Sequence, residues 1–275
     1  MSEITKRQSM LFIQQLRTAF SVLDDSIDFL KDTASVVKYL KSKTTSINTL
    51  KTYFSRIVAF LRNKPSFEKE TEIYRVLMTT YRNDYNKSRE TQSLTKAEEE
   101  KMLTKAEILK VRKVLKSKAI DLLSFQRYLI VCLYTYLPPQ RLDYADMCFT
   151  DRIGKNVCLP TKVIFREYKT ASTFGDRTLK LPKVLQQIIL EYREKYNKTD
   201  CLLIKQDGNP MTSAGLGQMI SSIFKTETGK GCTVNILRHR FITDMREGEL
   251  SLLEKQKLAD SMGHSLSTSE LYRRV

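Results

Sequence analysis

The chain has 275 residues, which allows one or two domains and a substantial core. Its 47 lysines and arginines against 31 acidic residues give a formal net charge of +16, which favours a polyanionic partner, most commonly nucleic acid. A generally lysine-rich surface is the alternative. No signal peptide opens the sequence and no apolar run reaches the roughly 18 residues that span a bilayer, so we expect a soluble intracellular protein with no membrane partner.

The cysteines and histidines argue against disulfides and against a metal site. The 5 cysteines are odd in number, lack Cys-x-x-Cys spacing, and several lie in apolar runs. The two histidines, His239 and His264, have no cysteine or carboxylate framework at ligand spacing. We therefore expect a reducing compartment, no metal and no cofactor.

The first ninety residues are predicted to form a helical domain. Apolar residues recur at three- and four-residue steps between Leu11 and Leu23, and again between Ile47 and Leu61. Residues 44–47 (Thr-Thr-Ser-Ile) have the composition of a helix start, and a further helix is expected over 71–81. Residues 1–90 carry a net charge of +6 and the remainder +10, so both parts are candidates for DNA contact. A plain helical bundle is the alternative for this domain.

A polar stretch over 83–101 lacks apolar periodicity, and we place a linker at 91–102 between domains of residues 1–90 and 103–275. The tetrapeptide Leu-Thr-Lys-Ala occurs at 94–97 and at 103–106. The second copy continues into Glu107, so that Thr104 and Glu107 have the pattern of a capping box. This pattern predicts that Thr104 opens the first helix of the second domain, which runs to about Lys116.

The second domain is predicted to be mostly helical with a small sheet. A helix over 119–137, apolar on most sides, ends at Pro138-Pro139 and should be central to the core. Short β-type runs follow at 144–149, 156–159, 162–167 and 177–181. Helices are expected again over 183–196, 213–224, 234–246 and 252–261. The predicted fold class is mostly α with a small antiparallel β-sheet (α+β).

Two arginines and a tyrosine lie in an order that suits phosphodiester chemistry. Arg141 follows the helix end at Pro138-Pro139, Arg238 lies in Leu-Arg-His at 237–239, and Tyr272 follows Met-Gly-His at 262–264. A tyrosine hydroxyl is a weak nucleophile at its free pKa of about 10, so it needs cations that stabilise the charge developing on a substrate. Guanidinium groups are planar, permanently charged and bidentate, so two of them would clamp a phosphodiester.

The ordered set of Leu-Arg-His, Gly-His-Ser and tyrosine boxes resembles the tyrosine recombinase (phage integrase) family over the C-terminal two thirds of the chain. The resemblance matches Lys169 to the family's β-hairpin lysine, with Lys162 and Lys180 as fallback candidates. Two positions depart from the family pattern. The family's His-x-x-Arg box begins here with Asn235, which cannot titrate, and His264 and Tyr272 are eight residues apart where many members have nine.

The resemblance implies a site-specific recombinase or integrase, of the kind carried by viruses and mobile elements, that works as a tetramer on double-stranded DNA without metal or ATP. Tyr272 would attack the phosphodiester to form a 3′-phosphotyrosyl link, and Lys169 would protonate the leaving 5′-hydroxyl. The developing charge would be held by Arg141, Arg238, His264 and Asn235. The helices of residues 1–90 would correspond to the family's core-binding domain, with Lys51 and Arg56 toward DNA.

Alternatives stay open for the chain and for its residues. A type IB topoisomerase uses a similar residue set, and a DNA-binding protein that has lost catalysis is suggested by Asn235 and by the short spacing before Tyr272. Each site residue also has a structural alternative. Arg141 can be a cation at a helix C-terminus, and Arg238 can form a salt bridge with Asp143 or Asp244. His264 can belong to a capped turn, and Tyr272 can be an aromatic residue that only packs against its neighbours. His239 is expected to have a structural role.

Overall fold

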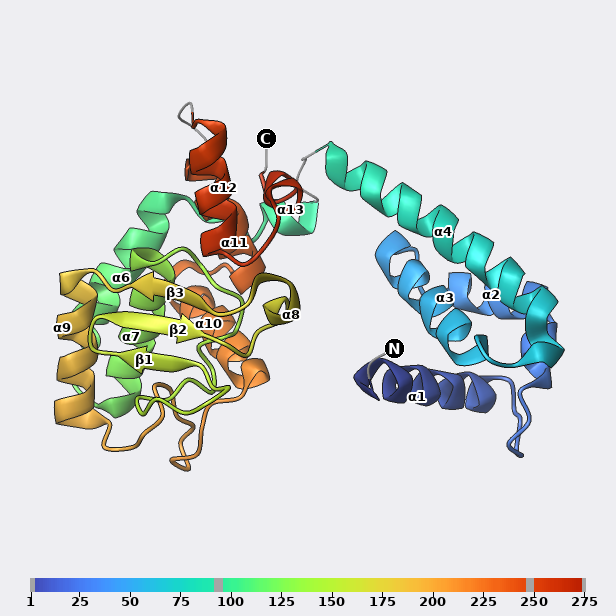
Figure 1. Ribbon diagram of the computed structural model, residues 1–275, viewed down its shortest axis with the longest axis horizontal. Coiled ribbons are helices and arrows are strands. Elements are labelled where there is room, and N and C mark those ends of the chain that lie inside the picture. The colour runs from blue at the N-terminus through green and yellow to red at the C-terminus, as the bar shows by residue number, and fades with distance from the viewer. Residues whose placement is uncertain (1–2, 92–95, 246–249, 274–275) are drawn as a thin grey trace. The chain divides into compact units, whose positions relative to one another are not determined.

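The computed structural model describes residues 3–91, 96–245 and 250–273. The chain divides into two compact units, Met1–Thr91 and Gln92–Val275 (Figure 1). Each unit has its own cluster of buried apolar side chains. The strands all belong to the second unit, which also contains every residue of the predicted catalytic set.

The N-terminal unit consists of helices α1 (Glu3–Ala19), α2 (Thr33–Lys43), α3 (Ile47–Leu61) and α4 (Glu68–Glu90), with short 3-10 turns at Asp28–Lys31 and Pro65–Phe67. The predicted start of α3 is confirmed, because the Ser46 side chain accepts a hydrogen bond from the backbone N–H of Thr49. Phe54 and Tyr74 are fully buried at the centre of this unit, and the Tyr74 hydroxyl donates to the Leu30 carbonyl at 2.9 Å.

The helix expected over 71–81 is longer than predicted, because α4 starts at Glu68 and continues through the polar stretch after residue 82 as far as Glu90. Residues 82–90 extend α4 as a mostly solvated helix, and there the Lys51 ammonium lies 4.1 Å from the centre of the Tyr85 ring. One residue before this extension, the Tyr81 ring stacks on Phe54 at 5.6 Å. Of the predicted linker, residues 92–95 lie outside the described residues, and 96–99 form the short helix α5 (Lys96–Glu99).

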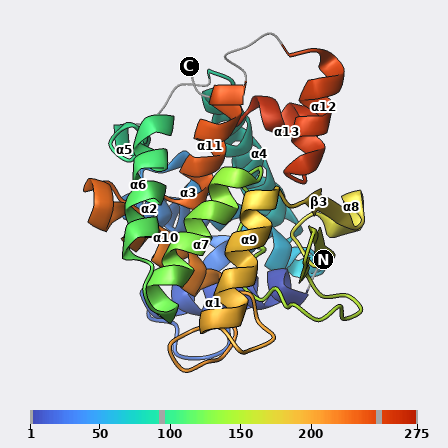
Figure 2. The same ribbon diagram turned by 90° about the vertical axis from the view of Figure 1, so that its left-hand side faces the viewer.

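In the C-terminal unit, α7 (Leu122–Tyr136) is the central helix, as its apolar sequence predicts. It is surrounded by α6 (Lys105–Lys118), α9 (Lys183–Glu191), α10 (Ser213–Thr228) and α11 (Val234–Met245). Figure 2 shows α6, α7 and α9 side by side. The capping box is confirmed: Thr104 Oγ1 accepts from the Glu107 N–H at 3.1 Å, and the Glu107 carboxylate accepts from the Thr104 N–H at 2.7 Å.

The ends of several helices in this unit are determined by capping residues. Helix α7 begins at Leu122 instead of residue 119 because the Asp121 carboxylate accepts from the Ser124 N–H at 2.8 Å. Beyond Glu191, α9 continues as a π-helical turn, Tyr192–Tyr196. Helix α10 is four residues longer than the predicted 213–224 and ends at Gly229, whose φ of 77° terminates the helix.

The sheet is antiparallel in the order β1 (Val157–Leu159), β2 (Lys162–Phe165), β3 (Arg177–Lys180), with Phe165 opposite Arg177 and Lys162 opposite Lys180. The strand predicted over 144–149 is wrong, since residues 143–146 form a turn and Cys148 makes only isolated bridges to Val157 and Cys201. The apolar character of this segment instead reflects burial, because Tyr144 and Met147 are fully buried in the core.

The chain ends with α12 (Leu252–Ser261) and the short helix α13 (Leu266–Glu270), which Figure 1 shows beside α11. The eight-residue separation between His264 and Tyr272 thus includes one short helix, with Ser265 as its N-cap. Arg246, at the end of the helix predicted over 234–246, lies outside the described residues.

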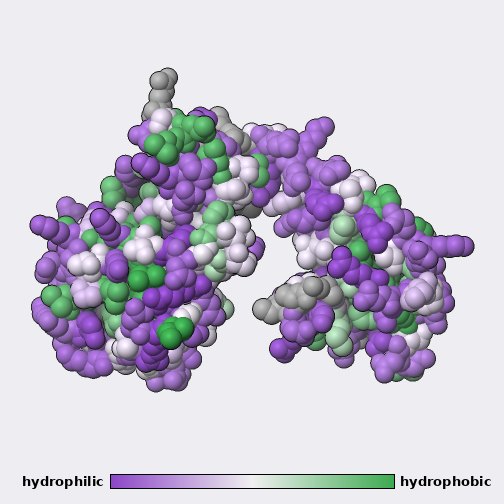
Figure 3. All heavy atoms as spheres, viewed as in Figure 1, coloured by the Kyte–Doolittle hydropathy of each residue, from purple (hydrophilic) through white to green (hydrophobic). Residues whose placement is uncertain are grey.

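The surface and the remaining composition fit this fold. In Figure 3 most of the visible surface of the C-terminal unit is hydrophilic, with apolar side chains in separate small patches. The 5 cysteines are unpaired. No helix among the described residues combines the length and apolar character needed to cross a membrane. Within the same ranges, no three His, Cys, Asp or Glu side chains are grouped as a metal ion would require.

Candidate active site

Tyr272 lies two residues beyond α13, against residues from α11 and from the turn after α12. Its ring centre is 4.7 Å from that of His239 and 5.2 Å from that of His264. The guanidinium carbon of Arg238 lies 5.0 Å from the same ring centre. His239 Nδ1 lies 2.7 Å from the Tyr272 carbonyl oxygen, and because a carbonyl can only accept, Nδ1 carries the proton. The backbone of Tyr272 is thus held by the helix that carries Arg238.

Arg238 is a completely buried cation, with 0% of its surface exposed. Its Nη1 donates to the Pro139 carbonyl at 3.0 Å, while Nε and Nη2 make no hydrogen bond to any described residue. Burial lowers the pKa of this guanidinium, and Tyr272 partly counteracts the shift. The structural role in a salt bridge does not hold, because neither Asp143 nor Asp244 pairs with Arg238 and Asp244 is bound by Arg240 instead. A buried guanidinium with two unpaired nitrogens is costly without an anionic partner, which makes Arg238 a candidate for binding an anion.

His264 follows α12 in a tight turn. Gly263 has a φ of 66°, and the His264 N–H donates back to the Ala259 carbonyl at 3.2 Å. The imidazole is 2% exposed, and neither ring nitrogen has a partner in the described part of the chain. Burial, followed by the charges of Arg238, Arg141 and Arg177, lowers the pKa of His264 to about 3. At neutral pH the ring is therefore uncharged and offers one N–H donor.

Arg141 and Asn235 line one hollow of about 620 Å³ at the edge of this group. Asp143 and the α10 residues Ser213 and Gln218 line it as well. Arg141 lies in the loop after α7, where its carbonyl accepts from the Tyr134 hydroxyl. The exposed Asn235 is in the first turn of α11, one turn before Arg238, and no hydrogen bond joins it to Tyr272 among the described residues.

Lys169 is exposed in the connection between β2 and β3, as expected for a hairpin lysine. The next residue, Thr170, donates through Oγ1 to the Gly263 carbonyl at 2.8 Å. This bond attaches the hairpin turn directly to the turn that carries His264. The fallback candidates Lys162 and Lys180 face each other at the other end of the hairpin.

Two polar residues of this region were not predicted from the sequence. Arg177, the first residue of β3, donates from Nη2 to Gln140 Oε1 at 3.0 Å and from Nη1 to the Ser261 carbonyl at 3.1 Å. Gln140 is fully buried and donates to the same Ser261 carbonyl at 2.9 Å. In the sequence Arg177 follows Gly175-Asp176 in an ordinary polar turn, and no spacing or motif distinguishes it.

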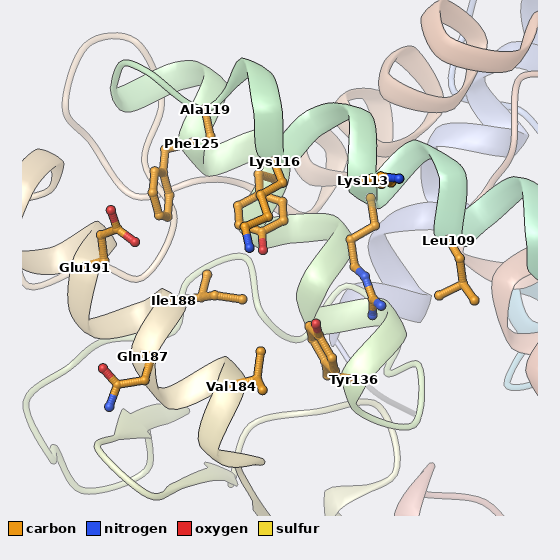
Figure 4. A pocket seen from close by; sticks show the side chains of 12 residues that line it. Leu109, Lys113, Lys116, Ala119, Phe125, Tyr136, Val184, Gln187, Ile188 and Glu191 are labelled. Atoms are coloured by element: carbon orange, nitrogen blue, oxygen red, sulfur yellow. The ribbon is translucent and has the colours of Figure 1, made fainter.

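A larger groove of about 720 Å³ lies elsewhere, between α6, α7 and α9, and contains none of the predicted site residues. Figure 4 shows its apolar residues, such as Ile188 and Val184, with Lys113 and Lys116 on one side and Glu191 on the other. Cavity size alone would therefore have indicated a different place. The candidate site is identified by Arg238 and His264, whose side chains both have buried nitrogens without a partner among the described residues and lie against Tyr272.

The fold is similar to those of several solved DNA recombinases. The Tn1549 transposon integrase (residues 82–397), in complex with circular intermediate DNA, has a TM-score of 0.65 and 17% identity over 100% of this chain and 90% of its own. XerH site-specific recombinase, bound to its difH substrate, has a TM-score of 0.50 and 16% identity over 98% of this chain and 75% of its own. XerA recombinase has a TM-score of 0.50 and 12% identity over 98% of this chain and 94% of its own.

In sequence, no protein-family model and no curated protein matches the chain. The likeness therefore concerns the arrangement of helices and strands, and it confirms the predicted α+β class with its small antiparallel sheet. The chain has the fold of the tyrosine recombinases.

Proposed function

We propose that this protein is a site-specific recombinase or integrase that cuts and rejoins double-stranded DNA through a covalent bond to Tyr272. The observation that carries the proposal is the contact between Tyr272 and the buried guanidinium of Arg238, two of whose nitrogens have no partner among the described residues. A phosphodiester would supply the anion that this guanidinium lacks and would place phosphorus beside a tyrosine.

The charges around the site suit the transition state of phosphoryl transfer. Arg141 and Arg238 would hold the non-bridging oxygens of the phosphate, since guanidinium groups bind such oxygens in a bidentate manner. The neutral His264 would donate its single N–H to one of these oxygens as negative charge develops there. Asn235 lines the same hollow as Arg141 and would add an amide donor at the edge of the phosphate.

Cleavage would proceed by in-line attack of the Tyr272 oxygen on phosphorus. The phenol loses its proton to solvent, a bond forms between phosphorus and the tyrosine oxygen, and the bond from phosphorus to the 5′ oxygen breaks. Lys169 gives a proton to this leaving oxygen. The 3′-phosphotyrosyl bond preserves the energy of the broken phosphodiester, so that attack by a 5′-hydroxyl rejoins the DNA without ATP. Exchange of strands between paired sites would require a tetramer on DNA.

The N-terminal unit would contribute contacts to the DNA backbone. Lys51 and Arg89 both lie near Tyr85: the Lys51 ammonium lies 4.1 Å and the Arg89 guanidinium 5.7 Å from the centre of its ring. Burial lowers the pKa of Lys51, and the charges of Arg89 and Arg82 lower it further. Like charges that repel one another in the free protein gain most from a phosphate placed between them. Arg56, whose guanidinium lies 5.6 Å from the Phe12 ring, is the other proposed contact of α3.

The cell that contains the target DNA is the proposed place of action, and a virus or mobile element the proposed source. The same chemistry in a type IB topoisomerase would reseal the strand that it cut. Site-specific capture distinguishes the two activities, because a topoisomerase relaxes a supercoiled plasmid without a particular site, whereas a recombinase traps a defined sequence.

The experiment mixes the purified protein with nicked duplexes of randomised sequence and detects covalent protein–DNA adducts after denaturation in SDS. We expect an adduct with the wild type and with Tyr136→Phe, which removes the hydroxyl of a partly exposed tyrosine outside the site, and none with Tyr272→Phe. Sequencing of the trapped DNA then tests for a defined site. Salt-sensitive DNA binding without an adduct in the wild type would contradict the proposal and favour a DNA-binding protein without catalysis.

A further inference from the structure

We propose that Arg177 is a positioning residue that holds the β2–β3 hairpin, the loop before Arg141 and the turn before His264 in one arrangement. This inference rests on the function proposed above and assigns a role to a residue outside the six predicted catalytic positions. The proposed role is to place the reacting groups and not to bind the phosphate, because both terminal nitrogens of Arg177 already donate hydrogen bonds to other residues of the protein.

The contacts of Arg177 join three segments that are far apart in sequence. From β3, its Nη2 donates to Gln140, the residue that precedes Arg141, at 3.0 Å. Its Nη1 donates to the Ser261 carbonyl at 3.1 Å, at the end of α12 and three residues before His264. The buried Gln140 closes the network with donations from Nε2 to Ser261 at 2.9 Å and to the Pro138 carbonyl at 2.7 Å.

The guanidinium is also confined by packing. It lies 4.2 Å from the centre of the Tyr168 ring and 5.4 Å from that of Phe165, both on the hairpin. Gly263 is also close to it, since a Cβ atom there would be only 2.7 Å from the Arg177 Cζ. A side chain held by hydrogen bonds from both terminal nitrogens and by packing against Gly263 and two aromatic rings has little freedom to move, so the hairpin and the His264 turn must move together.

Lys169 lies between two attachments of this hairpin. Thr170 donates to the Gly263 carbonyl at 2.8 Å, immediately after Lys169. Before it, the buried Asn156 donates to the carbonyls of Asp143 at 3.0 Å and Glu167 at 2.9 Å, and so connects the hairpin to the Arg141 loop. Arg177 is the only one of these attachments that contacts both the Arg141 side and the His264 side.

The role differs from that of an ordinary structural ion pair. The hydrogen-bond acceptors of Arg177 are an amide and backbone carbonyls, and among the described residues it forms no ion pair. On the same hairpin, Arg166 provides the contrast, since it pairs with Asp151 and Asp176, and none of its hydrogen bonds within the described ranges reaches Gln140 or residues 260–263. Arg166 is therefore a matched control.

The test compares Arg177→Met, Arg177→Lys and Arg166→Met in single-turnover cleavage of the sequence trapped by the wild type. We expect Arg177→Met to reduce the maximal rate of adduct formation by about 100-fold, the size of effect that a 1 Å misplacement produces, with little change in DNA affinity. Arg177→Lys should recover part of the rate, and Arg166→Met should change it by less than about threefold, as a control outside this network. Thermal unfolding of each variant verifies that it is folded.

A second substrate shows whether Lys169 is among the misplaced groups. A sulfur atom in place of the bridging 5′ oxygen leaves as a thiolate, which needs no proton from a lysine. The defect of Arg177→Met should be at least tenfold smaller on this substrate than on the ordinary phosphodiester. An equal defect on both substrates would overturn the part of the proposal that concerns the hairpin.

Hydrogen exchange tests the arrangement without relying on activity. We expect Arg177→Met to accelerate exchange at the amides of 168–175 and of 262–265, and Arg166→Met to leave the amides of 262–265 unchanged. Unchanged exchange in Arg177→Met, a loss of DNA affinity with an unaltered maximal rate, or an equal loss of rate in Arg166→Met would each overturn the inference. If the wild type forms no Tyr272 adduct, the proposed function fails, while accelerated exchange would still establish that Arg177 connects these segments.

Discussion

Replacement of Gly263 by alanine tests the packing of the site at a single atom. Gly263 has a φ of 66°, where a side chain adds strain of about 1–2 kcal/mol. In addition, the new Cβ would lie 2.7 Å from the Arg177 Cζ, whereas ordinary contact begins at 3.4 Å, so the guanidinium must withdraw by about 0.7 Å. That shift weakens hydrogen bonds to Gln140 and Ser261, each worth about 0.5–1.5 kcal/mol.

Gly208 is the matched control, because it has a φ of 79° and nothing within 4 Å of its Cβ position. Gly208→Ala should therefore show the backbone strain alone. We expect Gly263→Ala to lower the free energy of unfolding by about 1–3 kcal/mol more than Gly208→Ala does. For a unit of this size the extra loss corresponds to a melting temperature lower by about 2–12 °C.

Urea and thermal unfolding of the two alanine variants, and of Gly263→Ala combined with Arg177→Met, measure these differences. In the double variant the Cβ no longer meets a guanidinium, so the added effect of Gly263→Ala should fall to that of Gly208→Ala. Equal destabilisation by Gly263→Ala and Gly208→Ala in the wild-type background would refute the reasoning, since it would show that Arg177 does not rest against Gly263.

Three further predictions concern hydrogen bonds and ionisation. His239→Phe keeps the ring against Tyr272 but removes the N–H donor to its carbonyl. Adduct formation in single turnover should therefore slow by about 3–10-fold, and the loss of a bond worth about 0.5–1.5 kcal/mol should lower the melting temperature by about 1–6 °C. Because the pKa of His264 is lowered to about 3 in the folded protein, the unfolded chain takes up a proton at this residue at a higher pH than the folded chain does. The free energy of unfolding should therefore fall as the pH drops below about 6.5, by up to about 1.4 kcal/mol per pH unit. His264→Gln should remove this part of the pH dependence, as measured by urea unfolding at a series of pH values. The hydrogen bond from the Thr104 N–H, followed by that from Lys230, lowers the pKa of Glu107 to about 2. The Glu107 carboxylate therefore stabilises the folded state above about pH 4.5, and this stabilisation is lost toward pH 2. The difference in the free energy of unfolding between the wild type and Glu107→Gln should shrink over that pH range, and it would stay constant if the capping box were absent.

The elements of the fold were predictable where local chemistry decides them. The capping pattern at Thr104 and the apolar helix before Pro138 gave correct helices, because each carries its own start or stop signal. The segment 144–149 was misassigned because burial and strand formation favour the same apolar residues, and only the tertiary structure separates them. The polar end of α4 was missed because a solvated helix shows little apolar periodicity.

Part of the candidate site could be predicted because its residues lie in recognisable boxes. The structure brings Arg238, His264 and Tyr272 together, and it ties the Lys169 turn to Gly263. Arg177 was not predictable, since its partners are a backbone carbonyl and a glutamine that only the folded chain places beside it. The catalytic roles of these residues remain predictions.

The five-residue helix α13 has a consequence for when Tyr272 can react. A helix of this length is not stable by itself in water, so its position depends on a few anchors. The anchors include the Ser265 cap, the fully buried Ser269 and the bond from His239 to the Tyr272 carbonyl. Such a segment opens locally at a lower free energy than the core around it. The fraction of molecules with Tyr272 against Arg238 is thus an equilibrium population, and any partner that favours the open or the closed tail would regulate cleavage without touching the phosphate.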